Sequence, residues 1–189
     1  MQGSHDAKIA DNNIKLNGLS ELYLVQASDI EIENNIFDST GGWGIDTSNS
    51  VYIEIDGNSM QAGLRLTNGD NFTINNNEFS NITYGNDIAQ KTAIFIDGND
   101  NTISDNTIRN VGVAFLFMND SDHNLIENNT ILEVITDIQY YSSGLNNTFI
   151  NTDIAIVDIW EETYFETINY IDIEMFTIEG PVSGIELNI

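Results

Sequence analysis

A motif of one hydrophobic residue, two variable residues, asparagine, one variable residue and a second hydrophobic residue recurs seven times along the chain. Its first positions are separated by 23, 23, 19, 29, 23 and 23 residues. Self-similarity at a period of this length is typical of solenoids and other repeat architectures. The hydrophobic, asparagine and hydrophobic positions are Ile9, Asn12 and Ile14; Ile32, Asn35 and Phe37; Ile55, Asn58 and Met60; Ile74, Asn77 and Phe79; Ile103, Asn106 and Ile108; Ile126, Asn129 and Ile131; and, with threonine in place of asparagine, Phe149, Thr152 and Ile154.

The spacing inside the motif requires a bend. Inward-facing positions of a β-strand recur every second residue, whereas the two hydrophobic positions, such as Ile9 and Ile14, are five residues apart. Both can face one core only if the chain turns between them. Asparagine suits such a corner because it tolerates the left-handed backbone conformation that most residues avoid. Each unit is thus predicted to be a strand, an asparagine corner and a second strand.

A further hydrophobic alternation follows the motif, as in Leu22 and Leu24 or Ile94 and Ile96. Three short strands within 23 residues leave no room for the helix of a β-α-β unit. The remaining solution is a coil whose strands pair with their equivalents one turn away, and the chirality of parallel crossovers favours the right-handed sense. We therefore expect an all-β fold, a right-handed parallel β-helix of about seven coils.

Stacking the coils in register also stacks their corner asparagines. Each side-chain amide can then bond to the next, as in other structures built from stacked strands. The six asparagines predicted to form this ladder are Asn12, Asn35, Asn58, Asn77, Asn106 and Asn129. Thr152 takes the equivalent place in the last unit, which indicates that the ladder ends there. A structural role explains these residues better than ligand binding does.

The charge balance argues against two classes of partner. The chain has 30 Asp and Glu residues against 5 Lys and Arg, for a net charge of −25, and so acidic a surface repels nucleic acid and anionic lipid. The longest apolar stretch, Val111 to Met118, has eight residues, far fewer than the roughly twenty that a membrane-spanning helix needs. We expect neither nucleic-acid binding nor membrane insertion. The chain has no cysteine, which excludes disulfides and thiolate metal sites.

Two segments resemble a known group of proteins. Residues 99–108 read Asn-Asp-Asn-Thr-Ile-Ser-Asp-Asn-Thr-Ile, and residues 121–131 read Ser-Asp-His-Asn-Leu-Ile-Glu-Asn-Asn-Thr-Ile. They are similar to the β-helix repeats of pectin-lyase-like proteins, and among these to the carbohydrate-binding and sugar-hydrolase repeats of archaeal and bacterial surface proteins. The resemblance covers residues 7 to about 156. It implies the fold but no single function, because such repeats serve lyases, hydrolases, epimerases, adhesins and structural stalks.

The catalytic patterns of two enzyme classes in this group are incomplete here. Pectate lyases use a basic residue as the base beside acidic calcium ligands, but Lys8, Lys15, Arg65, Lys91 and Arg109 form no cluster in the sequence. Polygalacturonases carry Asn-Thr-Asp, Asp-Asp, Gly-His-Gly and Arg-Ile-Lys in order, and only Asn151-Thr-Asp153 is present. We therefore assign no catalytic residue. A polysaccharide-active lyase or hydrolase, or a fragment of one, is the alternative.

The irregular third and fourth units predict a notch in the side of the rod. From the ladder asparagine to the first inward residue of the later strand there are 10 residues in the second unit, 6 in the third and 17 in the fourth. Aromatic rings with polar neighbours suit a sugar, so we expect a carbohydrate site at Trp43, Asp46, Arg65, Tyr84, Asp87 and Lys91. The alternative is that the aromatic side chains cover the end of the core while Asp46 and Arg65 form a cross-strand ion pair.

Calcium is the second candidate ligand. Carboxylates on neighbouring turns can supply the oxygen ligands that calcium needs, and four aspartates lie in successive turns, at Asp97, Asp100, Asp120 and Asp122. No loop has the spacing of a dedicated calcium motif, so solvated acidic turns are the alternative.

The two ends of the chain differ from the repeat. Residues 1–6 look like an expression tag, residues 7–157 form the predicted β-helix, and residues 158–189 lack the motif, so we expect a fragment of a longer protein. The open end of a β-helix exposes core and strand edges that must be covered, and Trp160, Tyr164 and Phe165 suit such a cap. Residues 176–189 also look like the opening strands of an immunoglobulin-like or similar β-sandwich module.

These features favour a non-catalytic β-helix module of an exported, extracellular or cell-surface protein from an archaeon or a bacterium. Its expected role is structural spacing, adhesion or assembly. The expected partners are a polysaccharide or cell-surface glycan, neighbouring domains of the same protein, or further copies joined through free strand edges. Five Asn-x-Ser/Thr sequences agree with export; they begin at Asn71, Asn81, Asn119, Asn128 and Asn146.

Overall fold

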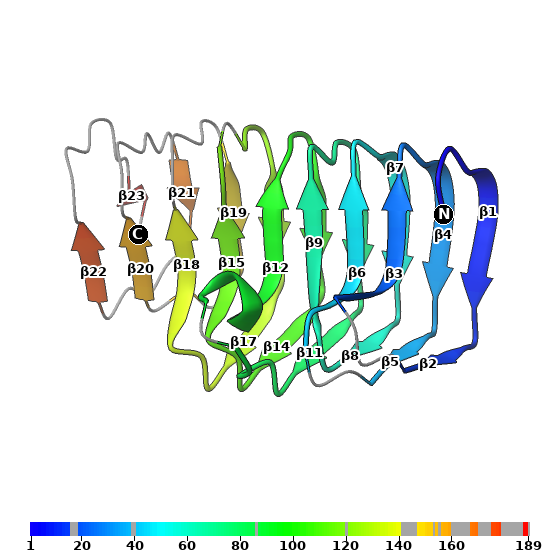
Figure 1. Cartoon of the computed structure of the whole chain (residues 1–189). Coiled ribbons are helices and arrows are strands. Elements are labelled where there is room, and N and C mark those ends of the chain that lie inside the picture. The colour runs from blue at the N-terminus through cyan, green and yellow to red at the C-terminus, as the bar shows by residue number, and fades with distance from the viewer. Residues whose placement is uncertain are drawn as a thin grey trace.

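The chain winds into a solenoid with three sheets that run along its axis, and the strands within each sheet are parallel (Figure 1). The computed structural model describes residues 1–15, 19–38, 41–85, 87–119, 121–140, 147–152, 154, 156–159, 167–169, 175–178 and 187–188. Within them the chain passes from one sheet to the next and then returns to the first, one strand further along.

Each sheet collects the equivalent strands of successive coils. Sheet A contains β3 (Ser20–Val25), β6 (Trp43–Ser48), β9 (Gly63–Thr67), β12 (Thr92–Asp97), β15 (Val113–Phe117), β18 (Thr136–Tyr140), β20 (Ile156–Ile159) and β22 (Met175–Ile178). Sheet B contains β1 (His5–Ala10), β4 (Ser28–Glu33), β7 (Val51–Asp56), β10 (Thr73–Asn75), β13 (Thr102–Ser104), β16 (Leu125–Glu127), β19 (Thr148–Ile150), β21 (Thr167–Asn169) and β23 (Leu187–Asn188). Sheet C contains β2 (Asn13–Ile14), β5 (Ile36–Phe37), β8 (Ser59–Met60), β11 (Glu78–Ser80), β14 (Thr107–Arg109) and β17 (Thr130–Leu132).

The strand pairing confirms the predicted all-β parallel coil. Ile9 pairs with Ile32, and Ile32 with Ile55, so equivalent motif positions lie side by side across coils of 23 residues. The described residues contain six complete three-strand coils, from β1 to β18, close to the seven expected. Sheets A and B then continue without a described strand in sheet C.

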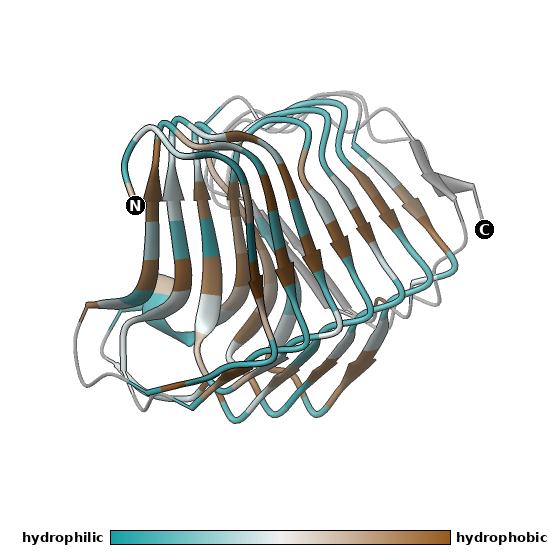
Figure 2. Cartoon of the chain, turned by 90° about the vertical axis from the view of Figure 1, so that its right-hand side faces the viewer, coloured by the Kyte–Doolittle hydropathy of each residue, from teal (hydrophilic) through white to brown (hydrophobic). Residues whose placement is uncertain are grey.

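The apolar residues between the three sheets form one continuous core, and Figure 2 shows hydrophobic positions recurring on successive strands. Hydrophobic strand positions recur at the same place in successive coils because the register is kept from coil to coil. Sheet B contributes a fully buried file of isoleucines, namely Ile32, Ile55, Ile74, Ile103 and Ile126. Isoleucine suits these positions because its β-branched side chain packs well on a pleated surface. Burial of each such side chain contributes about 1.5–3 kcal/mol.

The corner asparagines lie in one stack between sheets B and C. Asn12 donates its backbone N–H and its side-chain N–H to Oδ1 of Asn35, both at 3.0 Å. Asn35 donates in the same way to Asn58, at 2.9 and 3.1 Å, and the pattern continues to Asn129. The backbone N–H of Asn129 then meets Oγ1 of Thr152 at 3.4 Å.

The left-handed residue at each corner is the one before the ladder asparagine. Asn34 has a φ of 52°, and Gly57 has a φ of 64°, whereas no ladder asparagine has a positive φ. The prediction that the ladder asparagine itself takes the left-handed conformation is therefore wrong. The preceding residue makes the bend, and this leaves the next amide free to turn inward and bond along the stack.

A second, shorter ladder joins the turns between sheets A and B. Asn101 donates its backbone and side-chain N–H groups to Oδ1 of Asn124, at 3.0 and 2.9 Å. Asn124 donates likewise to Asn147, at 2.9 and 3.0 Å. In an earlier coil, Oγ of Ser50 accepts the backbone N–H of Ala27 at 3.1 Å. These turns are thus fixed by side chains that differ from coil to coil.

The insertion in the fourth coil ends in the short helix η1 (Ala89–Lys91), directly before β12. Lys91 lies against the next coil, where its carbonyl accepts the backbone N–H of Gly112 at 2.9 Å. Gly112 makes room for this contact, since an added Cβ would lie 2.6 Å from Cβ of Lys91. The described part of the chain has no helix long and apolar enough to cross a membrane.

Both ends of the chain contribute strands. His5 and Asp6, within the predicted tag, belong to β1, and Gln2 forms a parallel bridge with Val25. Beyond residue 157, β21, β22 and β23 keep the parallel pairing of sheets A and B. Trp160, Tyr164 and Phe165, proposed as a cap, lie outside the described residues. The domain boundary at residue 157 stays a prediction.

Candidate functional site

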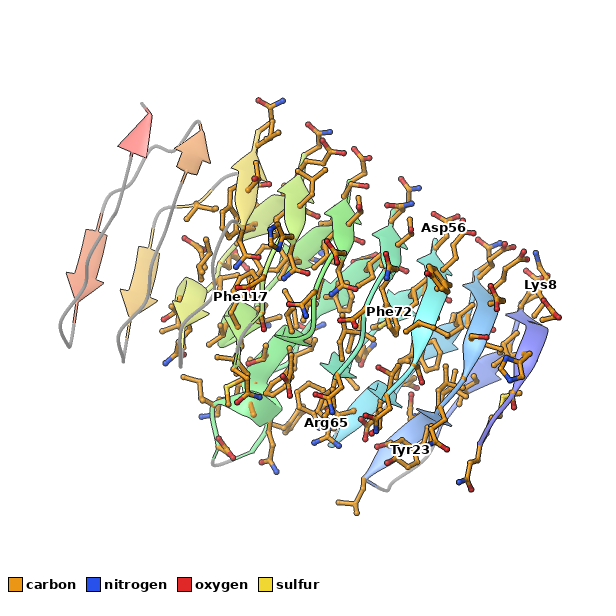
Figure 3. All side chains as sticks on the ribbon, turned by 90° about the horizontal axis from the view of Figure 1, so that it is seen from above. Lys8, Tyr23, Asp56, Arg65, Phe72 and Phe117 are labelled. Carbon is orange, nitrogen blue, oxygen red and sulfur yellow. The ribbon has the colours of Figure 1, made fainter. Side chains whose placement is uncertain are left out.

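The outer face of sheet A differs in chemistry from that of sheet B. Tyr23, Asp46, Arg65 and Phe95 stand in register on four successive strands of sheet A, and each lies between two inward-facing residues. The equivalent column on sheet B is Lys8, Glu31, Glu54 and Thr73. Figure 3 shows Tyr23 and Arg65 on one side of the coil and Lys8 and Asp56 on the other. This column of sheet A therefore combines aromatic side chains with a pair of opposite charges, whereas the column of sheet B is mainly charged.

A cleft of about 690 Å³ lies on this face. The strand column supplies Tyr23, Asp46 and Arg65, and η1 supplies Gln90 at one side. The described residues that line the cleft are Leu19, Ser20, Tyr23, Gly42, Trp43, Asp46, Arg65 and Gln90. A concave site that combines aromatic and apolar surface with a few fixed polar groups is typical of small-molecule binding.

A bidentate ion pair forms the floor of the cleft. Nε and Nη2 of Arg65 donate to Oδ1 and Oδ2 of Asp46, at 2.8 and 2.6 Å. Oγ of Ser20 donates to the same Oδ2 at 2.9 Å. Asp46 is only 3% exposed, so its charge depends on these partners. The hydrogen bond to Asp46 raises the pKa of Arg65 above its ordinary value, although partial burial opposes the shift.

The ring of Trp43 packs against the guanidinium of this ion pair. The ring lies 5.3 Å from the guanidinium carbon of Arg65, within the range of a cation–π contact, and meets the ring of Phe95 edge-on at 5.8 Å. The absence of a side chain at Gly63 makes room for this ring, because an added Cβ would be 2.8 Å from Cζ3 of Trp43. Trp43 is 7% exposed. It therefore holds Arg65 in place and offers little surface for stacking.

The structure brings three of the six predicted carbohydrate-site residues together. Trp43, Asp46 and Arg65 line one cleft, and the alternative expectation of a cross-strand ion pair is correct for Asp46 and Arg65. The other three residues lie elsewhere on the insertion. Tyr84 is 54% exposed outside the cleft lining, Oδ1 of Asp87 accepts the backbone N–H of Ala89, and Lys91 lies against Gly112.

Five residues of the cleft were not among the predicted site residues, namely Leu19, Ser20, Tyr23, Gly42 and Gln90. A signal for Tyr23 was present, because it lies between the inward-facing Leu22 and Leu24. The repeat spacing places it directly beside Asp46 in the next coil. No comparable signal in the sequence places Gln90, which reaches the cleft from the insertion.

The predicted calcium aspartates do not form a cluster within the described residues. No group of three or more His, Cys, Asp or Glu side chains there is placed to hold a metal ion. Asp97 lines a small cleft of about 260 Å³ with Asn68, Asp70, Gly98, Asn99 and Asn119. The backbone N–H of Asp122 donates to Oδ1 of Asn99 at 2.7 Å, Asp100 has a φ of 57°, and Asp120 lies outside the described residues.

Comparison with known proteins identifies the family. A family model described as a right-handed beta helix region matches residues 1–154. The chain belongs to the right-handed β-helix family. The match confirms the predicted handedness and agrees with the resemblance to pectin-lyase-like repeat proteins. No curated protein and no solved structure matched the chain.

Within this β-helix, the cleft is lined by hydrogen-bonding and aromatic groups with a single carboxylate among the described residues. Asp46 is the single carboxylate among the described residues that line it, and both its oxygens accept hydrogen bonds. The site thus combines a half-exposed phenol ring, a hydroxyl, an amide and a guanidinium held in fixed positions. These groups can bind a hydroxyl-rich ligand by stacking and hydrogen bonding.

Proposed function

We propose that this β-helix is a non-catalytic glycan-binding module of an exported surface protein, with its binding site in the cleft on sheet A. The observation that carries the proposal is the half-exposed Tyr23 beside the fixed Asp46–Arg65 pair. The family suggests a polysaccharide-related or surface protein. The acidic chain and its Asn-x-Ser/Thr sequences support export.

Each part of the cleft has a role in holding a sugar. The ring of Tyr23, which is 49% exposed, packs against the apolar C–H face of a pyranose, since tyrosine combines an apolar body with a polar tip. The guanidinium N–H groups of Arg65 that do not face Asp46 donate to sugar hydroxyls. The Gln90 amide both donates and accepts at the side of the cleft.

The same residues favour binding over hydrolysis. Most glycosidases use two carboxyl groups on opposite sides of the scissile bond, one of which is protonated. Asp46 is the one carboxylate in the described lining, and both its oxygens are engaged with Arg65 and Ser20. The proposed module therefore retains a glycan without cleaving it.

Glycan binding is tested with the full chain on a broad glycan array, followed by calorimetry on the bound glycans. Replacement of the stacking ring in Tyr23→Ala should weaken binding by about 5- to 150-fold, if a sugar ring gains from an aromatic platform about the 1–3 kcal/mol that a nucleobase does. The matched control is Tyr52→Ala, which removes a 59% exposed tyrosine from the opposite sheet B.

The control variant should bind as the wild type does. An array without any bound glycan, or equal losses in the two tyrosine variants, would contradict the proposed function. Release of reducing ends from a bound polysaccharide would contradict its non-catalytic part.

A further inference from the structure

We infer that the cleft on sheet A selects neutral oligosaccharides and discriminates against uronic acids. The inference rests on the proposed glycan binding and adds the chemical class of the sugar. It follows from the pairing of charges in the cleft, from the depth of Asp46 and from the charge of the whole chain.

The charges in the cleft cancel. Arg65 and Asp46 are the two charged residues in the described lining, and they are joined by two hydrogen bonds of 2.8 and 2.6 Å. The guanidinium keeps N–H groups that do not face Asp46, so it can still donate to a neutral hydroxyl. It offers no uncompensated positive charge to a sugar carboxylate.

The carboxylate of a uronic acid could form an ion pair with Arg65 only by displacing Asp46. Asp46 is 3% exposed, and its partners are Arg65 and Ser20. Withdrawal of the guanidinium would leave a buried carboxylate without its counter-ion, which is strongly unfavourable. The cation–π contact with the ring of Trp43, at 5.3 Å, also holds the guanidinium in place.

The whole chain adds a long-range penalty. A net charge of −25 repels a polyuronate before contact, and the repulsion extends over about one Debye length. Neutral chains escape this repulsion. Their binding should therefore be insensitive to salt, whereas any binding of a uronate should strengthen as salt is added.

The column of lining residues sets the length of the ligand. Tyr23, Asp46 and Arg65 lie on three adjacent strands, and adjacent strands are about 4.8 Å apart, close to the length of one pyranose. Gln90 from η1 lies at one side of the same cleft. The site therefore fits about three sugar units laid across the strands.

The test is calorimetry of the full chain with the β-1,4-linked tetramers of glucose, mannose and xylose and the α-1,4-linked tetramer of galacturonic acid, alongside neutral oligosaccharides that bind on the array. The inference expects at least one neutral sugar to bind with an affinity that changes less than about twofold between about 50 and 500 mM NaCl. Tetragalacturonate should bind at least about tenfold more weakly. Equal or tighter binding of tetragalacturonate would overturn the inference while leaving glycan binding intact. Binding of no glycan in any class would overturn the proposed function itself.

Asp46→Asn provides a second test in the opposite direction. The substitution keeps the shape of the side chain and frees the charge of Arg65, so affinity for tetragalacturonate should rise at least about tenfold. Glu31→Gln removes the same charge from the exposed face of sheet B and should leave uronate binding within about twofold. An equal gain in both variants would assign the selectivity to net charge and overturn the role of the Asp46–Arg65 pair. The wild-type comparison stands on its own if Asp46→Asn does not fold.

Discussion

A single ladder asparagine connects three coils of the solenoid. The side chain of Asn77 accepts from Asn58 in the preceding unit and donates to Oδ1 of Asn106 in the following one. It also donates to the carbonyl of Ile55, in the preceding coil, at 2.8 Å. Buried amide groups in such a stack have no water to replace a lost partner, so each position matters more inside the rod than at its end.

Asn77→Ala should therefore lower the free energy of unfolding by about 3 kcal/mol, because at least two buried polar groups lose partners at about 1–3 kcal/mol each. Asn12→Ala, at the exposed start of the ladder, should cost less than about 1 kcal/mol. Urea unfolding followed by circular dichroism measures both values. Similar losses in the two variants would contradict the greater weight of the buried ladder positions.

At the scale of the strand, the close packing of β6 on β9 depends on one glycine. Gly63 pairs with Trp43 beside an irregularity in the register between Trp43 and Ile45. An added Cβ would lie 2.3 Å from the carbonyl oxygen of Thr92 and 2.8 Å from the ring of Trp43. Neither neighbour can move without disturbing the backbone hydrogen bonds of sheet A or the ion pair at the floor of the cleft.

Gly63→Ala should lower the free energy of unfolding by about 1–3 kcal/mol, the usual cost of overpacking. It should also weaken glycan binding, because the added methyl group displaces the Trp43 ring from its contact with Arg65. Gly41→Ala is the matched control, since nothing lies within 4 Å of its added Cβ. Thermal unfolding and calorimetry on both variants check the pair of effects. A Gly63→Ala protein with wild-type stability would rule out a tight contact at this position.

The inward side of each strand could be predicted from the sequence, and so could the outward column. The alternation that buries Leu22 and Leu24 also points Tyr23 outward, and the 23-residue period places it beside Asp46. The ladder followed from the same period. The ladder prediction succeeded because spacing is recorded directly in a linear sequence, and the position of Tyr23, which was missed, could have been read from the same pattern.

The direction of the insertion could not be predicted in this way. Its length shows that residues project from the fourth coil, but a loop of this length can fold toward either neighbouring coil. The contact between Lys91 and Gly112 directs it toward the fifth coil. Tyr84 and Asp87 lie outside the lining of the cleft, and of the described residues of the insertion Gln90 alone reaches it.

At the scale of the whole molecule, the net charge of −25 opposes the stacking of coils. Like charges repel within a compact rod more strongly than in an extended chain. The ion pairs on the described surface are few; Lys8, for instance, serves both Glu31 and Glu33, and its hydrogen bonds to Glu33 and Glu31 raise its pKa. Dissolved salt should therefore supply much of the screening.

Raising NaCl from about 10 to about 500 mM should increase Tm by several degrees, since the Debye length falls from roughly 30 Å to roughly 4 Å and each kcal/mol corresponds to about 2–4 °C for a chain of this size. The scans are made with EDTA present, so that screening is separated from the binding of divalent cations. A Tm that stays constant across the series would mean that repulsion between the coils is negligible.

The asparagine ladder also gives the rod a direction. Each amide oxygen faces the preceding coil, and one N–H of each amide donates to the amide oxygen of the following coil, so the small dipoles add head to tail as they do along an α-helix. The oxygen of Asn12 lies at the negative pole of this array. Two molecules that met by their first coils would oppose like poles, whereas contact between unlike ends would extend the array. The side chain of one residue type thus makes the two ends of the rod electrically inequivalent.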